Sequence, residues 1–443
     1  MRSIKFNLST PNINAWDGAV TLTEAYLVET LKANQLLERL PDTFPGERRA
    51  TCQSLFLGAL RHGHRVQDAL QPFIRQKPRA LIEAIFLVAG YEMLSAHTEK
   101  HPKIVHHAVE RSKNLAAPAE TRLLNAVLRK LPEALNATHS SNRPDVHFSH
   151  PKWLFKRWNK EFGPQITIKL MEWNQRVPAT YLKLYGSHSE QPKGLEATEW
   201  DQFYKVSADA SWKNDLHPLL NKGNAYVKDP STRLAPELLA PRKGEDVLDL
   251  CAAPGGKAYD IAHIMSLEGR IVALDLPGNR IQRLSENLKN LATDTLQCTI
   301  LERDLLELTN DTFAQKQLPT QYDAVMLDAP CSNTGVIQRR TDVKWRLSVK
   351  DVSNCAYLQK KLIAAASHCV KPGGRLVYST CSIEIDENKK VVETFLKSED
   401  GARFSLKDSA ISLPWETGHD GASAFLLVAE ESAKNAADHS ACL

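Results

Sequence analysis

The sequence lacks any run of roughly 20 uncharged apolar residues, which is what a membrane-spanning helix requires. Its longest apolar stretch, ALIEAIFLVAGYEML at 80–94, carries Glu83 and Glu92 and therefore predicts a buried helix. The N-terminus MRSIKFNLSTPNINAWDG has neither the continuous apolar core nor the small-residue cleavage site of a secretory signal. We therefore expect a cytoplasmic protein that does not contact membranes.

A paired cysteine pattern is also missing. The chain has 8 cysteines in 443 residues, and none of them stand in C-x-x-C spacing. This arrangement argues against a disulfide framework and against a zinc site, so we expect free thiols and no metal. A single cysteine is more often a small core residue than a nucleophile. We assign to that class Cys251, Cys298, Cys355 and Cys369.

Acidic residues are comparatively scarce in the first half of the chain. Residues 1–230 carry 31 Lys and Arg against 23 Asp and Glu, whereas residues 231–443 carry 25 against 29. The basic excess indicates a front part that docks a polyanion, with chance variation of the surface as the competing interpretation.

The length and the changing texture of the chain predict several domains. Residues 1–138 follow a helical period, the polar run NATHSSNRP at 136–144 has the composition of a linker, and a Trp-rich mixed segment follows. From about residue 230, short apolar runs alternate with helical stretches, which is typical of βαβ units. We expect an all-α domain at 1–138, a small α+β domain at 139–229, an α/β Rossmann-like domain with a mostly parallel sheet at 230–430, and a disordered tail at 431–443.

The stretch EDVLDLCAAPGGKAYDIA predicts a strand, a glycine turn and a helix, a design that lets the backbone approach a ligand closely. It is not a P-loop, because Cys251 and Ala258 stand where Gly and Ser or Thr are needed. Nor is it a dinucleotide fingerprint, because Gly255 and Gly256 are its only glycines. A ligand with a ribose but no pyrophosphate remains.

Two aspartates at the ends of further predicted strands narrow the choice of ligand. Asp275 comes about 20 residues after the glycines, where a carboxylate can accept both ribose hydroxyls. Asp304 ends a third candidate strand and could accept from an adenine amine. Taken singly, each aspartate is more often a helix cap, but together they suggest S-adenosylmethionine.

Two cysteines follow strand-like runs at the same predicted edge: Cys331 in LDAPCSNTGV and Cys381 in LVYSTCSIEIDEN. Amine methyltransferases typically place an aromatic residue near that point, to stack on the base. A thiol answers a different need, since carbon 5 of a pyrimidine is a poor nucleophile until a thiolate adds at carbon 6. Chemistry alone leaves open which of the two thiols attacks.

The motifs DLCAAPGGK, LDAPCSNTGV with DVKWR downstream, and YSTCSIEIDEN resemble those of RNA cytosine carbon-5 methyltransferases. The helical segment around NAVLRKL is similar to the RNA-binding fold of the antitermination factor NusB. The combination resembles the bacterial 16S ribosomal RNA methyltransferases of the RsmB (Sun/Fmu) family, over nearly the whole chain.

The resemblance implies a role for each motif residue. It implies Cys381 as the nucleophile on carbon 6 and Cys331 as the thiol that assists product release, and we expect Asp328 to hydrogen-bond the ring. It also implies an S-adenosylmethionine site lined by Cys251, Ala252, Ala253, Pro254, Gly255, Gly256, Lys257, Asp275, Asp304 and Asp328. Lys228 and Pro230 depart from the family pattern before the glycine strand, and Arg303 stands where glycine is common.

The expected substrate is one cytosine of 16S rRNA, free of or partly assembled with ribosomal proteins, and we expect the enzyme to act as a monomer. One alternative is the same chemistry on transfer RNA or on another ribosomal site. The other is a non-catalytic RNA-binding assembly factor, which would have no use for two thiols at a strand edge.

Overall fold

The computed structural model describes residues 14–41, 44, 46–139, 143–186, 191–221, 223–289 and 291–431. The chain forms two compact units. The first contains residues 1–177 and 337–346, and the second contains residues 178–336 and 347–443. The first unit thus extends past the predicted boundary at 138. The tail predicted at 431–443 lies outside the described residues except for its first position.

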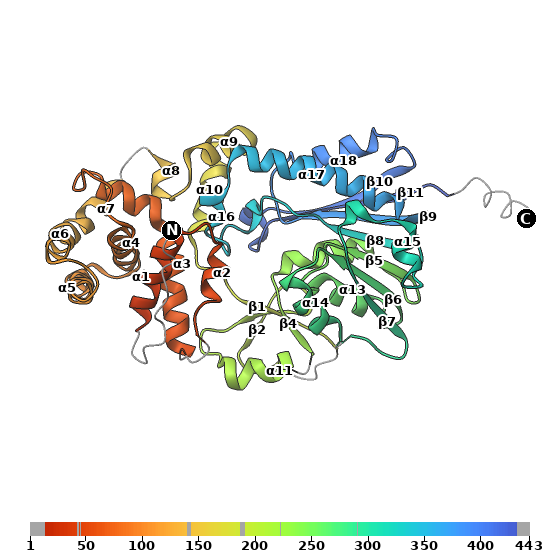
Figure 1. Cartoon of the computed structure of the whole chain (residues 1–443), viewed down its shortest axis with the longest axis horizontal. Helices are drawn as coiled ribbons and strands as arrows, with labels where there is room; N and C mark the ends of the chain where they lie inside the picture. The colour runs from red at the N-terminus through yellow and green to blue at the C-terminus, as the bar shows by residue number, and fades with distance from the viewer. Residues whose placement is uncertain are drawn as a thin grey trace, which may run out of the picture. The chain divides into compact units, whose positions relative to one another are not determined.

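Helices build the first unit, which confirms the all-α prediction for the front of the chain. They are α1 (Ala15–Val28), α2 (Ala33–Leu37), α3 (Gly46–Leu70), α4 (Ala80–Ser95), α5 (His101–Ser112), α6 (Pro118–Leu128), α7 (Leu131–His139), α8 (Pro144–His147), α9 (Lys152–Phe162), α10 (Pro164–Gln175) and α16 (Val343–Arg346). The predicted buried helix is α4, which packs against α1 and α3 (Figure 1). Its sequence is apolar almost all round, and such a helix is stable only when it is enclosed.

Residues 337–346 belong to the first unit although they lie far from its other residues in the sequence. Ala33 N donates to Asp342 Oδ2 at 3.2 Å, and Lys344 Nζ donates to Arg61 O at 2.8 Å. Trp345 Nε1 donates to Leu60 O at 2.8 Å. The DVKWR motif that supported the family resemblance therefore packs with the helices of the N-terminal part.

Two sheets build the second unit. The smaller is antiparallel, in the order β2-β3-β1-β4, and is accompanied by α11 (His217–Asn221). Its strands are β1 (Tyr181–Leu184), β2 (Leu195–Ala197), β3 (Phe203–Val206) and β4 (Ala225–Val227). They enclose a small apolar cluster around Leu182 and Leu184.

The larger sheet has seven strands in the order β10-β11-β9-β8-β5-β6-β7. The strands are β5 (Asp246–Leu250), β6 (Gly269–Asp275), β7 (Leu296–Glu302), β8 (Tyr322–Asp328), β9 (Val370–Thr380), β10 (Phe404–Ser412) and β11 (Ala422–Ala429). Strands β9 to β7 are parallel, and β10 and β11 are antiparallel. This confirms the mostly parallel Rossmann-like sheet.

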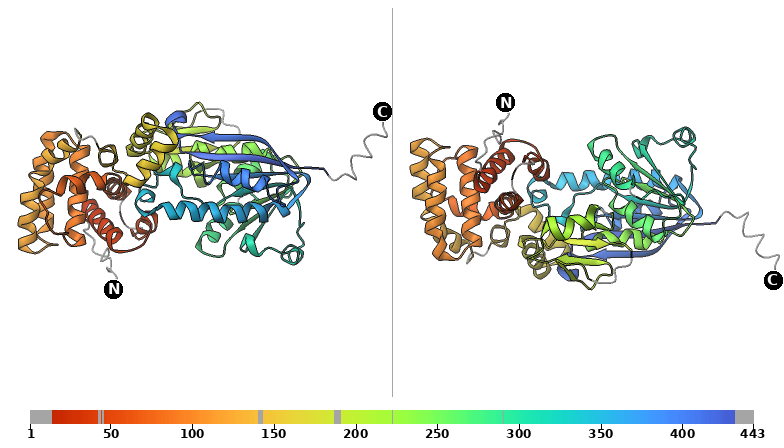
Figure 2. Two further views of the ribbon diagram at one scale, coloured as in Figure 1. Left: turned by 90° about the horizontal axis from the view of Figure 1, so that it is seen from above. Right: turned by 90° about the horizontal axis from the view of Figure 1, so that it is seen from below.

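Helices cover both faces of this sheet (Figure 1). Those on one face are α12 (Leu234–Leu239), α13 (Gly256–Ile264) and α14 (Asn279–Lys289), and those on the other are α15 (Asn310–Ala314), α17 (Val349–His368) and α18 (Lys389–Leu396). Figure 2 shows α17 as a long helix alongside the strands. The strand order reverses between β5 and β8, and ligands of such sheets bind beyond the carboxyl ends of the strands at that reversal. No helix in the described part of the chain is long and apolar enough to cross a membrane.

Candidate active site

The two predicted thiols lie side by side. Cys331 comes three residues after β8, and Cys381 directly follows the neighbouring parallel strand β9. Their sulfur atoms are 3.4 Å apart. Ser379 Oγ, on β9, donates to Asp328 Oδ1 at 3.0 Å. The structure thus brings together all three side chains that were predicted to be catalytic.

Asn333 contacts both of the loops that carry Cys331 and Cys381, called the thiol loops below. The sequence analysis did not identify it. Its Nδ2 donates to Cys331 O at 2.7 Å, and its Oδ1 accepts from the Cys381 thiol at 3.3 Å. Its φ is 62°, in the left-handed region that asparagine tolerates better than most residues. The PCSN turn itself was the available signal, because an asparagine in such a turn holds neighbouring backbone groups.

The surroundings of Cys331 favour its protonated form. The pKa of Cys331 is raised well above its usual value, mainly by its hydrogen bond to the Cys381 sulfur. Burial and the negative charge of Glu387 act in the same direction. Cys331 therefore keeps its proton near neutral pH and presents its S–H to Cys381.

Lys257, the last residue of the predicted cofactor loop, forms an ion pair with Asp328. Burial alone would lower the pKa of Lys257, but the charge and hydrogen bond of Asp328 outweigh burial and raise it. The charge of Cys381 acts in the same direction on the pKa of Lys257.

The loop at 251–257 is held in a specific backbone shape. Gly255 has a φ of +102°, which L side chains rarely adopt, and it caps the N-terminus of α13. Asp275 Oδ2 accepts from Ala253 N at 2.8 Å, and Asn287 Nδ2 donates to Pro254 O at 2.7 Å. The loop is therefore tied to the end of β6 and to α14, and the N-terminus of α13 follows it directly.

Asp249, on β5, is a second candidate residue that the sequence analysis missed. Its side chain is 0% exposed, and neither carboxyl oxygen has a hydrogen-bond partner among the described residues. Burial raises its pKa well above the usual value, and the charges of Asp328 and Asp275 contribute. A buried polar group without a partner costs about 1–3 kcal/mol, which is more typical of a ligand site than of a core. The aspartate inside the apolar run DVLDL was the signal.

These side chains fit S-adenosylmethionine. Asp249, Asp275 and Asp328 stand at or near the carboxyl ends of the three adjacent strands β5, β6 and β8. Three carboxyl groups around a glycine turn match a ligand that has a cationic end and ribose hydroxyls, and the unpartnered Asp249 provides acceptors that nothing else in the described chain uses.

Asp304 lies beyond the end of β7, at the edge of this group. Its Oδ1 accepts from Leu306 N at 2.9 Å and caps the 3₁₀ turn η4 (Leu305–Glu307). That is the cap interpretation raised for each aspartate taken singly, and the proposed contact of Asp304 with adenine stays a prediction. Arg303, one of the departures from the family pattern, donates its N–H to Asp275 O at 3.1 Å and so joins the ends of β7 and β6.

Lys228, which also departs from the family pattern, contacts the first helical residues of α13, where the loop at 251–257 ends. Its Nζ donates to Gly256 O at 2.7 Å and pairs with Asp260 Oδ2 at 2.9 Å. Asp260 also binds Lys183 Nζ at 2.9 Å and accepts from Tyr185 at 2.7 Å. Burial lowers the pKa of Lys228 to about 8. A lysine at this position therefore anchors the first turn of α13.

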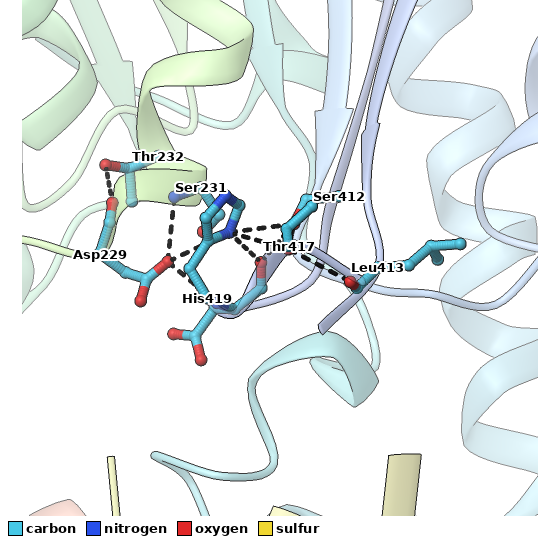
Figure 3. Close-up of polar contacts among 8 residues, drawn as sticks. Asp229, Ser231, Thr232, Ser412, Leu413, Thr417 and His419 are labelled. Atoms are coloured by element: carbon cyan, nitrogen blue, oxygen red, sulfur yellow. Dashed lines mark hydrogen bonds and ion pairs between the residues drawn. The ribbon is translucent and has the colours of Figure 1, made fainter. Parts of the chain in front are cut away.

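The loop between β10 and β11 is tied to the turn that follows β4 (Figure 3). Asp229 Oδ1 accepts from Ser231 N at 3.0 Å and from Asp420 N at 3.1 Å. Ser412 Oγ lies 3.0 Å from His419 Nδ1, which is itself 4.0 Å from Asp229 Oδ1. Because serine and aspartate face the same ring nitrogen, these groups do not form a relay of the Ser-His-Asp type, in which the two partners use opposite nitrogens.

The same loop reaches the thiols through two glycines. Gly421 N donates to Gly335 O at 2.8 Å, and Gly335 N donates to Cys381 O at 3.1 Å. A Cβ at Gly335 would lie 2.6 Å from Gly421 O and 2.7 Å from Cys381 O, so only glycine fits. The loop therefore supports the backbone that carries Cys381.

Two protein families match separate parts of this chain. Residues 236–419 match the family described as 16S rRNA methyltransferase RsmB/F, and residues 15–133 match the NusB family. The chain is similar to the ribosomal RNA small subunit methyltransferase B of Proteus mirabilis, with 29% identity over 89% of this chain and 94% of the relative. The corresponding protein of Salmonella paratyphi B is 28% identical over 87% of this chain and 91% of the relative.

Solved structures share the fold. The structure of PH0851 superimposes with a TM-score of 0.73 at 21% identity and covers 95% of this chain and 99% of its own. NSun6 from Pyrococcus horikoshii with SFG gives a TM-score of 0.53 at 18% identity, covering 64% of this chain and 99% of its own. Within the described residues, no group of three or more His, Cys, Asp or Glu side chains is arranged to hold a metal ion.

Proposed function

Because the chain belongs to the RsmB/F family of S-adenosylmethionine-dependent rRNA methyltransferases and carries a NusB-family domain, we propose that it methylates carbon 5 of a cytosine in 16S rRNA through a covalent cysteine adduct. The observation that carries the proposal is the pair of sulfur atoms 3.4 Å apart beside Asp328 and Lys257. An amine methyltransferase needs no thiol, whereas activation of carbon 5 needs a nucleophile on carbon 6.

Each thiol has its own part. The Cys381 thiolate forms a bond to carbon 6, and the C5–C6 electron pair becomes that of an enamine, nucleophilic at carbon 5. Bound S-adenosylmethionine supplies the methyl group that carbon 5 takes up. A base then removes the proton from carbon 5, the electron pair restores the double bond, and the S–C6 bond breaks. Cys331, which retains its proton and is hydrogen-bonded to the Cys381 sulfur, assists this release.

Asp328 and Lys257 would orient the ring. The Asp328 carboxylate is already held by Ser379 and Lys257, so it can accept from the exocyclic amine of cytosine without reorganising. The paired ammonium group also opposes the negative charge that develops on the ring oxygen as the thiolate adds. Asp249, Asp275 and the loop at 251–257 would hold the cofactor.

The RNA must present its target base outside a helical stack, because a thiol cannot reach the edge of carbon 6 inside one. The helical unit offers side chains suited to binding phosphate. Among them are His101, His106, Asn125 and Arg129, which line part of a cavity of about 760 Å³. We infer that this unit holds the rRNA while the second unit carries out the reaction.

The decisive experiment is methyl transfer from labelled S-adenosylmethionine to unmodified 16S rRNA, transfer RNA and DNA, followed by bisulfite mapping. We expect one protected cytosine in 16S rRNA. Protection in transfer RNA alone would move the proposal to that substrate, and label without any protected cytosine would refute carbon-5 chemistry.

A further inference from the structure

Near the thiols, four hydrogen bonds converge on the carboxyl group of Glu387, from the DEN sequence that follows β9. It is 0% exposed. Its Oε1 accepts from Ser332 N at 2.8 Å and from Gln359 Nε2 at 3.3 Å. Its Oε2 accepts from the hydroxyls of Ser332 and Ser382. Each oxygen therefore has at least two hydrogen-bond partners, so neither is left unsatisfied.

The donors of these bonds come from both thiol loops. Ser332 directly follows Cys331, and Ser382 directly follows Cys381. The two hydroxyls also lie 3.2 Å from each other. Gln359 extends the network, since its Nε2 also donates to Pro330 O at 2.8 Å. One carboxylate therefore joins the residues that come immediately after each reactive sulfur.

We propose that Glu387 is a positioning residue, which holds the attacking and the releasing thiol at reacting distance by binding Ser382 and Ser332 at the same time. The inference rests on the proposed function for the roles of the two thiols. The connection that it describes is a property of the folded chain and can be measured without RNA.

The charge of Glu387 gives it a second effect. Within the described part of the chain, no cationic side chain pairs with it, so its negative charge is not cancelled locally. That charge helps to raise the pKa of Cys331, and with burial it raises the pKa of Cys355 on α17 to about 12. The carboxylate therefore favours the thiol form of Cys331, the form that can support release of Cys381 from carbon 6.

The test compares Glu387→Gln with Glu393→Gln in the full-length protein. Glu393 is a matched control on the surface of α18, where it pairs with Lys389 at 3.7 Å. Iodoacetamide labelling of Cys331 and Cys381 is followed separately, by peptide mass spectrometry, between pH 6 and pH 10. We expect Glu387→Gln to label Cys331 about tenfold faster at pH 8, with a smaller change at Cys381, because the thiol loses a neighbouring negative charge.

Enzymatic readouts distinguish positioning from simple loss of structure. We expect kcat of Glu387→Gln to fall roughly 10- to 100-fold, while KM for RNA and for S-adenosylmethionine stays within about twofold. Glu387→Asp should restore part of kcat. If Glu387→Gln does not fold, as judged by circular dichroism, the double variant Ser332→Ala, Ser382→Ala removes the same hydroxyl bonds and takes its place, with loss of kcat as the expected result.

Unchanged labelling of both thiols in folded Glu387→Gln would overturn the positioning role, even if methylation were lost. By contrast, wild-type protein that labels as expected but forms no 5-methylcytosine would refute the proposed function and leave the positioning role standing.

Discussion

Glu387 and Asp249 are equally buried carboxyl groups near the carboxyl ends of the strands of the large sheet, but they have no similarity in their hydrogen bonding. Glu387 accepts on both oxygens from three side chains and a backbone N–H, whereas Asp249 accepts on neither among the described residues. Both have a raised pKa because both are buried. The group whose bonds are complete serves the internal geometry of the thiols, and the group whose bonds are missing is suited to a ligand.

The largest effect should come from the thiols. Cys381→Ala should lower methyl transfer at least about 10³-fold and form no RNA adduct, because the covalent route is lost. Cys331→Ala should accumulate a covalent protein–RNA adduct that denaturing gel electrophoresis detects. Cys298→Ala, a thiol on β7, should behave as wild type. Adducts in Cys381→Ala, and none in Cys331→Ala, would reverse the assigned roles.

Next in size is the effect of Asp249→Asn, which replaces the unpartnered carboxyl group by an amide. We expect cofactor affinity to fall about tenfold or more in calorimetry, because an amide cannot ionise opposite the cationic end of the ligand. Asp246→Asn, at the other end of the same strand, is the control and should bind the cofactor normally.

The same variant makes a prediction about pH. The pKa of Asp249 is raised in the folded protein above its ordinary value of 3.8, so the folded state holds its proton more tightly than the unfolded state. The contribution of this group to stability is therefore complete below that ordinary value and is lost as pH rises through the folded-state pKa. Melting curves without cofactor should show the stability of the variant increasing relative to wild type as pH rises from 5 to 8. An unchanged difference across that range would mean that Asp249 is not protonated in the fold.

A smaller effect is expected at the anchor of the cofactor loop. Lys228→Met keeps the apolar stem but loses the bond to Gly256 O and one partner of Asp260. Cofactor affinity should fall about three- to tenfold, and the free energy of unfolding should decrease by about 1–3 kcal/mol. Lys243→Met, which removes an exposed pair with Glu268, should change neither quantity. Normal cofactor affinity in Lys228→Met would show that the loop does not depend on this anchor.

The smallest effect should lie in the helical unit, away from both carboxyl groups. Arg129→Glu should raise the Kd for RNA several-fold and reduce the slope of log Kd against log salt by about 1, because one phosphate contact is lost. Cofactor affinity should not change. Arg48→Glu, an exposed site on α3 with the same change of charge, is the control, and equal effects of the two variants would indicate only a general loss of positive charge.

Much of the candidate site was predictable because it follows the strands. The runs before Asp275, Asp328 and Cys381 are apolar and short, and the carboxyl ends of parallel strands meet at one edge. Asp249 and Lys228 were harder to recognise. Asp249 lies within an apolar run, and Lys228 interrupts a motif, so neither shows its surroundings in the sequence. Glu387 follows Cys381 by six positions, but only folding brings Ser332 to it.

The helices of the N-terminal part, the mostly parallel sheet and the residues at the ends of its strands could all be predicted from the order of amino acids. Periodicity and strand spacing are local properties, so they can be read along the chain. Three features could be seen only in the folded chain. Two sulfur atoms lie 3.4 Å apart, one carboxylate joins both thiol loops, and residues 337–346 pack with the N-terminal helices. Most of those contacts join residues far apart in the sequence, and their distances depend on how several elements pack at once.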